Sequence, residues 1–176
     1  TAGGLTMVLA DGNVASGKTL TITGTTLGAS DVLSVNAAAE TNGTVAINVS
    51  VAVAANHVAT LGTGADTYTG TLNTGVQTVT ATAGANTIIT GTGVDIINVG
   101  TGTDTVTVNA GIANTVNFTL STHLVANSVT ITDWTKAKGI ITFDVADLNA
   151  GAKLQNLGVT SDDAVAGDTG IDIITG

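Results

Sequence analysis

The sequence of 176 residues contains no cysteine and no proline, and only 2% of it is aromatic. Without cysteine the chain has no disulfides, no cysteine-based zinc site and no thiol catalysis. Arginine is also absent, and four lysines face 13 acidic residues, for a net charge of −9. A nucleic-acid surface is therefore disfavoured, because phosphate binding needs clustered Lys and Arg. The scarcity of aromatic residues likewise disfavours a sugar-binding platform.

Long apolar runs are missing as well. No run reaches the length of a membrane helix, so we expect no membrane insertion. We recognise no signal peptide at the start of the sequence. We therefore expect a processed product, an internal fragment, or secretion that uses a signal elsewhere.

Residue patterns typical of catalysis are scarce. His57 and His123 are the only histidines, and they lie in no metal-ligand or catalytic spacing, so we expect them on strands or at the surface. Glu40 is the only glutamate, and a glycosidase-type carboxylate pair would need two aspartates without a supporting motif. The sequence therefore predicts a protein that is not an enzyme.

The residues that are abundant indicate an all-β protein. Thr, Val and Ile fit a pleated strand, whereas Gly and Asn fit tight turns. Of the 13 acidic residues, 12 are aspartates, whose short hard-oxygen side chains suit divalent cations.

A nine-residue unit repeats through the middle of the chain. Residues 91–99 (GTGVDIINV) and 100–108 (GTGTDTVTV) match in period and in the role of each position, and 62–68 is a copy offset by two residues. One position of the unit carries a side-chain oxygen in each of four successive copies: Gln77, Asn86, Asp95 and Asp104.

The unit has a simple physical reading. Gly-x-Gly permits a tight turn with positive φ, the Asp follows, and an alternating pair such as Ile97 and Val99 makes a short strand with one face inward. Nine residues cannot bury that face alone, so successive units must stack. The sequence therefore predicts a β-roll or β-solenoid of nonapeptide repeats flanked by short β-sheet modules.

We expect three regions along the chain. Residues 1–61 form an N-terminal β module, 62–117 a degenerate roll of repeats, and 118–176 a C-terminal β segment that ends in a further repeat. We expect the flanking modules to be antiparallel, and the only candidate helix spans 144–155. Strands are expected over 18–23, 32–35, 44–53, 128–132 and 140–145.

The two ends of the sequence are in register with each other. The last repeat, 168–176, contains Asp172, and the next unit would start where the sequence stops. Residues 1–7 resemble 82–88 and continue the register without a gap. This match predicts head-to-tail addition of copies, a heterologous contact that can continue as an open fibre.

The repeats resemble the calcium-binding nonapeptide of RTX (haemolysin-type) proteins, G-G-x-G-x-D-x-U-x, over 62–108 and 168–176. The opening segment is similar to modules of RTX-type bacterial surface-layer proteins. The resemblance implies a parallel β-roll that holds Ca²⁺ between turns two repeats apart, through turn carbonyls and Asp side chains. The metal-site residues that it implies here are Asp66, Gly93, Asp95, Gly102, Asp104 and Asp172.

The chain departs from that family pattern at the stacked positions. Eighteen residues before Asp95 stands Gln77, and eighteen before Asp104 stands Asn86, so neither edge stacks two aspartates. Fewer carboxylates imply weaker binding or fewer ions. Two alternatives stay open: the aspartates cap backbone N–H groups in turns, or the amides form hydrogen-bonded ladders that need no metal.

Together these features favour a structural subunit of an extracellular assembly at the cell surface, a surface layer or a filament stabilised by Ca²⁺. Its expected partners are copies of itself, with cell-surface polysaccharide as a further candidate. The alternative is a calcium-binding module of a larger secreted adhesin or RTX protein.

Overall fold

The computed structural model describes residues 3–109, 113–118, 128–132, 139–143 and 158–159. These residues form strands, and no helix long and apolar enough to cross a membrane occurs among them. The strands are β1 (Gly4–Val8), β2 (Thr19–Thr23), β3 (Val32–Asn36), β4 (Thr44–Asn48), β5 (His57–Thr60), β6 (Thr67–Thr69), β7 (Gln77–Thr80), β8 (Thr87–Ile89), β9 (Ile96–Val99), β10 (Thr103–Thr107), β11 (Asn114–Phe118), β12 (Ser128–Thr132), β13 (Gly139–Phe143) and β14 (Gly158–Val159).

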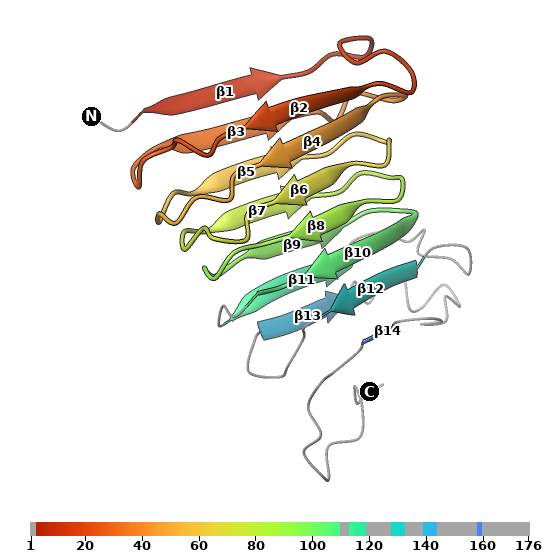
Figure 1. Ribbon diagram of the computed structural model, residues 1–176. Helices are drawn as coiled ribbons and strands as arrows, with labels where there is room; N and C mark the ends of the chain where they lie inside the picture. The colour runs from red at the N-terminus through yellow and green to blue at the C-terminus, as the bar shows by residue number, and fades with distance from the viewer. Residues whose placement is uncertain (1–2, 110–112, 119–127, 133–138, 144–157, 160–176) are drawn as a thin grey trace.

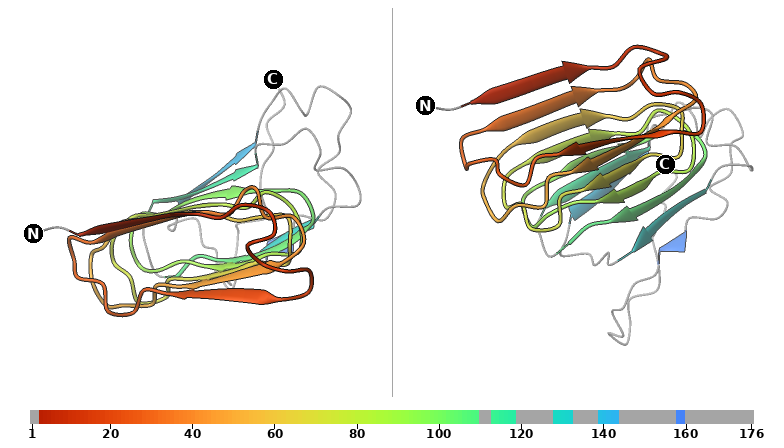
Figure 2. Two further views of the ribbon diagram at one scale, coloured as in Figure 1. Left: turned by 90° about the horizontal axis from the view of Figure 1, so that it is seen from above. Right: turned by 45° about the horizontal axis from the view of Figure 1, so that its top comes forward.

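The strands form two sheets of seven strands each. One contains all the odd-numbered strands in the order β1-β3-β5-β7-β9-β11-β13, and the other contains all the even-numbered strands. We call them the odd-strand sheet and the even-strand sheet. The chain alternates between them, so each coil adds one strand to each sheet (Figures 1 and 2). This arrangement is a flattened β-solenoid, and it confirms the predicted all-β solenoid fold.

All strand pairs in the described residues are parallel, for example β1 with β3 and β10 with β12. The expectation of antiparallel flanking modules is therefore wrong for these strands. The physical reason is the constant sense of coiling, which returns each strand beside its predecessor in the same direction. Strands β1 to β5 pair into the same two sheets as the later ones, and neither sheet is interrupted at residue 61.

Coil length varies along the stack. Gly4 of β1 pairs with Val32 of β3, 28 residues later, whereas Thr78 of β7 pairs with Ile96 of β9, 18 residues later. Two nonapeptides therefore make one coil in the middle of the chain. The strand expected over 44–53 ends at Asn48, and the candidate helix over 144–155 lies outside the described residues.

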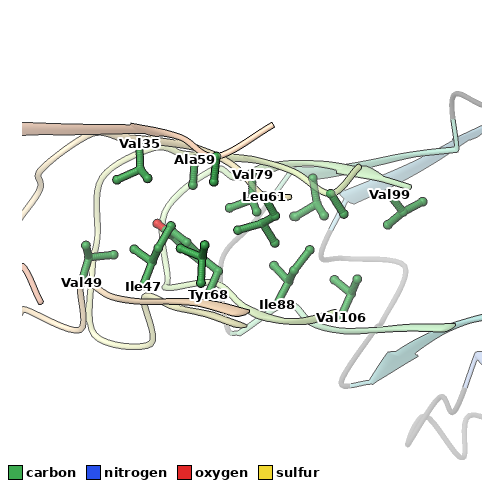
Figure 3. Close-up of a cluster of buried hydrophobic side chains, with 14 of the residues drawn as sticks. Val35, Ile47, Val49, Ala59, Leu61, Tyr68, Val79, Ile88, Val99 and Val106 are labelled. Carbon is green, nitrogen blue, oxygen red and sulfur yellow. The ribbon is translucent and has the colours of Figure 1, made fainter. Parts of the chain in front are cut away.

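The core lies between the two sheets, where alternate residues of each strand point inward (Figure 3). Each of the central side chains is at most 2% exposed. They come from the odd-strand sheet at Val35, Ala59, Val79 and Ile97, and from the even-strand sheet at Ile47, Tyr68, Ile88 and Val106. Because the strands stack in register, like residues form continuous columns, which gives the short repeats the burial that one repeat lacks.

Candidate metal and ladder sites at the corners of the solenoid

Polar side chains form two buried columns where the strands begin. We name each column by its first and last residue. The His57–Asn114 column starts the strands of the odd-strand sheet, and the Asp66–Asp104 column starts those of the even-strand sheet, so the columns lie at opposite edges of the coil. All members are at most 2% exposed: His57, Gln77, Asp95 and Asn114 in the first, and Asp66, Asn86 and Asp104 in the second.

In the Asp66–Asp104 column each side chain bonds the backbone one coil earlier. The Val45 N–H donates to Oδ1 of Asp66 over 2.7 Å, and the Asp66 N–H donates to Oδ1 of Asn86 over 3.1 Å. Asn86 then donates twice to Oδ1 of Asp104, from its backbone N–H over 3.0 Å and from its side-chain Nδ2 over 2.9 Å. The result is a continuous ladder of side-chain oxygens and backbone N–H groups.

The His57–Asn114 column follows the same rule with one interruption. The Gln77 N–H donates to Oδ1 of Asp95 over 2.9 Å, and the Asp95 N–H donates to Oδ1 of Asn114 over 2.8 Å. Gln77 itself does not bond the His57 N–H. Its Oε1 instead accepts the Tyr68 hydroxyl across the core over 2.9 Å, while the carbonyl of Val76 accepts the His57 N–H over 3.0 Å.

The ladders supply hydrogen-bond acceptors to backbone N–H groups at the corners of the solenoid. The N–H groups that these side chains bond lie at or beside the start of a strand, at a corner of the coil, and a buried N–H without an acceptor is costly. A side-chain oxygen placed just before the strand of the next coil supplies that acceptor. At Asp66, Asp95 and Asp104 the geometry is therefore that of backbone capping and of an amide-containing ladder.

Burial also leaves part of the carboxylates of Asp66 and Asp95 unsatisfied. Desolvation raises the pKa of Asp66 and Asp95, and the N–H groups of Val45 and Gln77 offset this only in part. The nearby Thr90 hydroxyl also lowers the pKa of Asp95. The Gly62 backbone likewise lowers the pKa of Asp66, but no group meets the full geometry of a hydrogen bond at the Oδ2 atom of Asp66 or Asp95. A buried anionic oxygen in that position calls for a cation or a proton.

The predicted ligands do not gather into one cluster. Among the residues that the structure describes, no three His, Asp or Glu side chains converge as a metal-binding group. Asp95 lies at the edge opposite Asp66 and Asp104, and Asn86 separates those two. A cation at either edge would therefore need backbone carbonyl oxygens as well. Asp172 lies outside the described residues.

Gly93 and Gly102 stand in the turns before β9 and β10. A Cβ on Gly93 would collide with the carbonyl oxygen of Gly75, and one on Gly102 with that of Gly84. Gly102 also has a φ of 115°. These glycines let the backbone of one turn lie directly on the turn before it, and their predicted role as carbonyl ligands stays a prediction.

Glu40 is a corner residue that the repeat pattern did not reveal. It is fully buried, and its carboxylate accepts N–H groups from Val14 over 3.1 Å, Gly43 over 3.0 Å and Asn42 over 3.3 Å. Burial alone would raise its pKa, but the three N–H donors outweigh it and lower the pKa. The one available signal was its place before the Asn42-Gly43 turn, outside the nine-residue period.

His57 begins strand β5, in agreement with the expectation of a strand histidine, and it is buried. Its Nδ1 accepts the Leu33 N–H over 3.3 Å, and burial lowers its pKa. Neutral imidazole thus takes the place that an aspartate or an amide holds in later coils. His123 lies outside the described residues.

The fold and its corners define the class of protein: a parallel β-solenoid whose edges are closed by side-chain-to-backbone ladders. No protein-family model, curated protein or solved structure matches the chain. The function proposed below therefore depends on the residues and geometry of this chain.

Proposed function

We propose that the chain is a structural, non-enzymatic subunit of an extracellular assembly at the cell surface, a surface layer or filament, that associates head to tail and is stabilised by calcium. The observation that carries this proposal is the self-similarity of the coils. Val106 in β10, for example, pairs with Ile88 on one side and with Ile131 on the other through the same parallel register. Each coil pairs with the coil before it and with the coil after it through the same strand register. A coil of a second copy could therefore pair with the last coil of the stack in the same way.

The N-terminal end of the described stack supports such a contact. Leu5 of β1 points inward in register with Leu33 of β3, yet Leu5 is 52% exposed and Leu33 only 3%. A covering coil would bury this apolar side chain and pair the free edge of β1. In the proposed assembly that coil comes from another copy. In the alternative, a module of a larger secreted adhesin, it comes from the same polypeptide.

The buried chemistry supports a structural role. His57, Glu40, Asp66 and Asp95 are the groups that would suit acid–base chemistry, and each bonds the backbone of another coil or turn. Their polar atoms hold coils together.

Calcium enters the proposal at Asp66 and Asp95. Their Oδ2 atoms are buried and without a hydrogen-bond partner, and hard carboxylate oxygens of this kind suit Ca²⁺. The turn carbonyls beside Gly93 and Gly102 would supply further oxygens. An ion that binds only the folded chain would stabilise it by mass action.

Electron microscopy and sedimentation of the purified chain, with calcium and with a chelator, test the assembly. We expect filaments or sheets in calcium, and assembly should be lost in Leu5→Asp, which places a charge on the end of the core. Thr6→Asp is the matched control, because Thr6 lies on the same strand and is exposed on its outer face. Wild-type protein that stays monomeric in calcium at high concentration would contradict the proposal.

Isothermal titration calorimetry with Ca²⁺ tests the ion separately. We expect heat of binding for the wild type and a reduced number of sites in Asp66→Asn and Asp95→Asn. If the protein assembles but binds no calcium, the proposed structural role stands and the proposed stabilisation by calcium is wrong.

A further inference from the structure

The outer face of the even-strand sheet is covered by threonine. Side chains alternate along each strand, so every second residue of these strands points away from the core. The strand register places twelve of the outward residues in two adjacent columns. One column contains Thr21, Ala46, Thr67, Thr87, Thr105 and Thr130, and the other contains Thr23, Asn48, Thr69, Ile89, Thr107 and Thr132. We call this surface the threonine face.

The threonine face is a regular two-dimensional grid. Neighbouring positions lie about 4.8 Å apart between strands and about 6.6 Å apart along a strand. Threonine is β-branched, so its side chain has few rotamers on a strand and its hydroxyl and methyl groups stay in fixed places. Each threonine of the grid thus presents one hydroxyl and one methyl group, and Ala46, Asn48 and Ile89 are the three positions of the two columns that do not.

The hydroxyl groups of this face are mostly left to water. Within the described ranges, the one bond between two of its threonines joins the hydroxyls of Thr107 and Thr132 over 2.7 Å. Thr67, Thr87 and Thr105 are exposed or half-exposed, and their hydroxyls bond no group of the described chain. Each can donate one hydrogen bond to water and accept two.

The chemistry of the threonine face narrows its possible ligands. The outward positions of β2, β4, β6, β8, β10 and β12 hold no charged and no aromatic residue. The face therefore has no group for pairing with ionic partners and no platform on which a sugar ring stacks.

The outer face of the odd-strand sheet is different. Val58 and Ile96 interrupt its hydroxyl pattern. Its amides bond within the protein, with Asn98 Nδ2 donating to Thr80 over 3.0 Å and Asn117 Nδ2 donating to Asn98 over 2.8 Å. Thr60, Thr78 and Thr115 on this surface also keep hydroxyls without a partner among the described residues, but aliphatic and amide side chains separate them. The surface therefore lacks a uniform grid and serves as an internal control.

We propose that the threonine face binds the surface of ice, so that the chain adsorbs to growing crystals and limits their growth. In a tetrahedral water network with O–H···O distances of about 2.75 Å, second-neighbour oxygens are about 4.5 Å apart, close to the strand spacing. The methyl groups restrict the orientation of the first water layer, and the hydroxyls anchor that layer by hydrogen bonds. Water molecules held on this grid have a spacing close to that of the oxygens at an ice surface, so this hydration layer can become part of the crystal. This activity is separate from the proposed assembly and uses a different surface.

Ice-crystal microscopy and thermal-hysteresis measurements on the purified full chain test the proposal. The wild type should shape crystals and hold them without growth below the melting point. The double variant Thr87→Lys/Thr105→Lys, which places two charges in the grid, should return both readings to those of buffer. Thr78→Lys on the outer face of the odd-strand sheet should keep the wild-type activity, and circular dichroism establishes that each variant is folded.

Two results would overturn the proposal. Crystals that grow in the wild-type protein as they do in buffer would refute it directly, and so would an equal loss of activity in Thr78→Lys. Sedimentation of the same proteins identifies the competing occupant. Wild-type dimers that the double variant splits, without any effect on ice, would make this face a contact between copies. Leu5→Asp tests the other surface, so failure of the ice proposal leaves the head-to-tail assembly unaffected.

Discussion

The carboxylate of Asp95 accepts a hydrogen bond from the backbone N–H of Gln77, one coil earlier and 2.9 Å away. The nine-residue period places these residues 18 apart, which is one full coil. The position at which the RTX resemblance implies a calcium ligand thus also joins two coils. In the proposal the two roles use different oxygens, Oδ1 for the backbone and Oδ2 for a cation, and substitutions separate them.

We expect Asp95→Ala to destabilise the calcium-free protein by about 1–3 kcal/mol, because it leaves the buried Gln77 N–H without an acceptor. Asp95→Asn keeps an acceptor oxygen and removes a buried charge, so its stability should equal or exceed that of the wild type. Asn86 and Asn114 already fill the equivalent positions of neighbouring strands. Urea unfolding in chelator measures both variants. If Asp95→Asn loses as much free energy of unfolding as Asp95→Ala, the charge of Asp95 and not its acceptor oxygen stabilises the contact between the two coils.

Repeating these unfolding measurements in calcium separates the two roles. With calcium bound as proposed, the wild type gains stability by mass action and Asp95→Asn gains less. An identical response of the two proteins to calcium would show that Asp95 is not a ligand.

The contribution of Asp66 and Asp95 to the stability of the calcium-free protein should grow as the pH is lowered from neutrality, whereas buried His57, whose pKa is lowered, acts in the opposite sense below its ordinary value of 6.5. Burial raises the pKa of Asp66 and Asp95 above the ordinary value of 3.8, so the folded chain binds protons more readily than the unfolded chain. Their contribution is complete below pH 3.8 and is lost as the pH rises through the raised pKa values. The difference in the free energy of urea unfolding between the wild type and Asp95→Asn, followed from neutrality down to pH 3.8, measures the contribution of Asp95, because His57 is common to both proteins.

Glu40 and Asp31 impose the opposite dependence at lower pH. Their folded pKa values lie below the ordinary 4.5 and 3.8, so their contributions are present above those values and are lost as the pH falls through the lowered pKa values. Together the two effects predict that the combined contribution of these carboxylates to stability is greatest in mildly acidic solution. If the contribution of Asp95, obtained by comparison with Asp95→Asn, does not grow as the pH is lowered from neutrality, the prediction is wrong.

The sequence predicts the solenoid where its period is short. In β9 the spacing of Ile97 and Val99 behind a Gly-x-Gly turn is sufficient, because such a strand is buried only by stacking. The period disappears upstream, where the coil from Gly4 to Val32 is 28 residues long, and the sequence therefore does not indicate that the same two sheets continue there. Inserted loop residues lengthen a coil without changing its register, which hides the repeat.

The sequence also predicts which residues lie at the corners of the solenoid, but it does not predict what their side chains bond. The recurring oxygen position correctly marks Asp66, Asp95 and Asp104 as unusual, but their binding of a backbone N–H depends on the offset between coils. Glu40 performs the same task outside the period, with three donors from two separate turns. That kind of convergence is visible only in three dimensions.

Tyr68→Phe should destabilise the protein by about 1–3 kcal/mol, although it removes only one oxygen. Tyr68 is 1% exposed, and its hydroxyl donates to Oε1 of Gln77 over 2.9 Å in the core. Burial raises the pKa of Tyr68, so the phenol stays a donor over the working pH range.

A double-mutant cycle with Gln77→Leu tests whether this bond is the cause. Each single variant leaves one buried polar group without its partner, whereas the double variant Tyr68→Phe/Gln77→Leu removes both groups. We therefore expect the double variant to lose less stability than the sum of the two single losses. Additive losses in thermal or urea unfolding would show that the two side chains act independently.

Gly102→Ala should cost more stability than Gly12→Ala, although both glycines have positive φ, 115° and 87°. A Cβ at Gly102 would collide with the carbonyl oxygen of Gly84 in the preceding turn, whereas nothing lies within 4 Å of a Cβ at Gly12. Both variants share the conformational cost of a side chain at positive φ, about 1–2 kcal/mol, so their difference isolates the stacking of one turn on another. Urea unfolding measures that difference. Equal losses would mean that the conformation of the turn alone demands glycine, and that neighbouring coils have room to move apart.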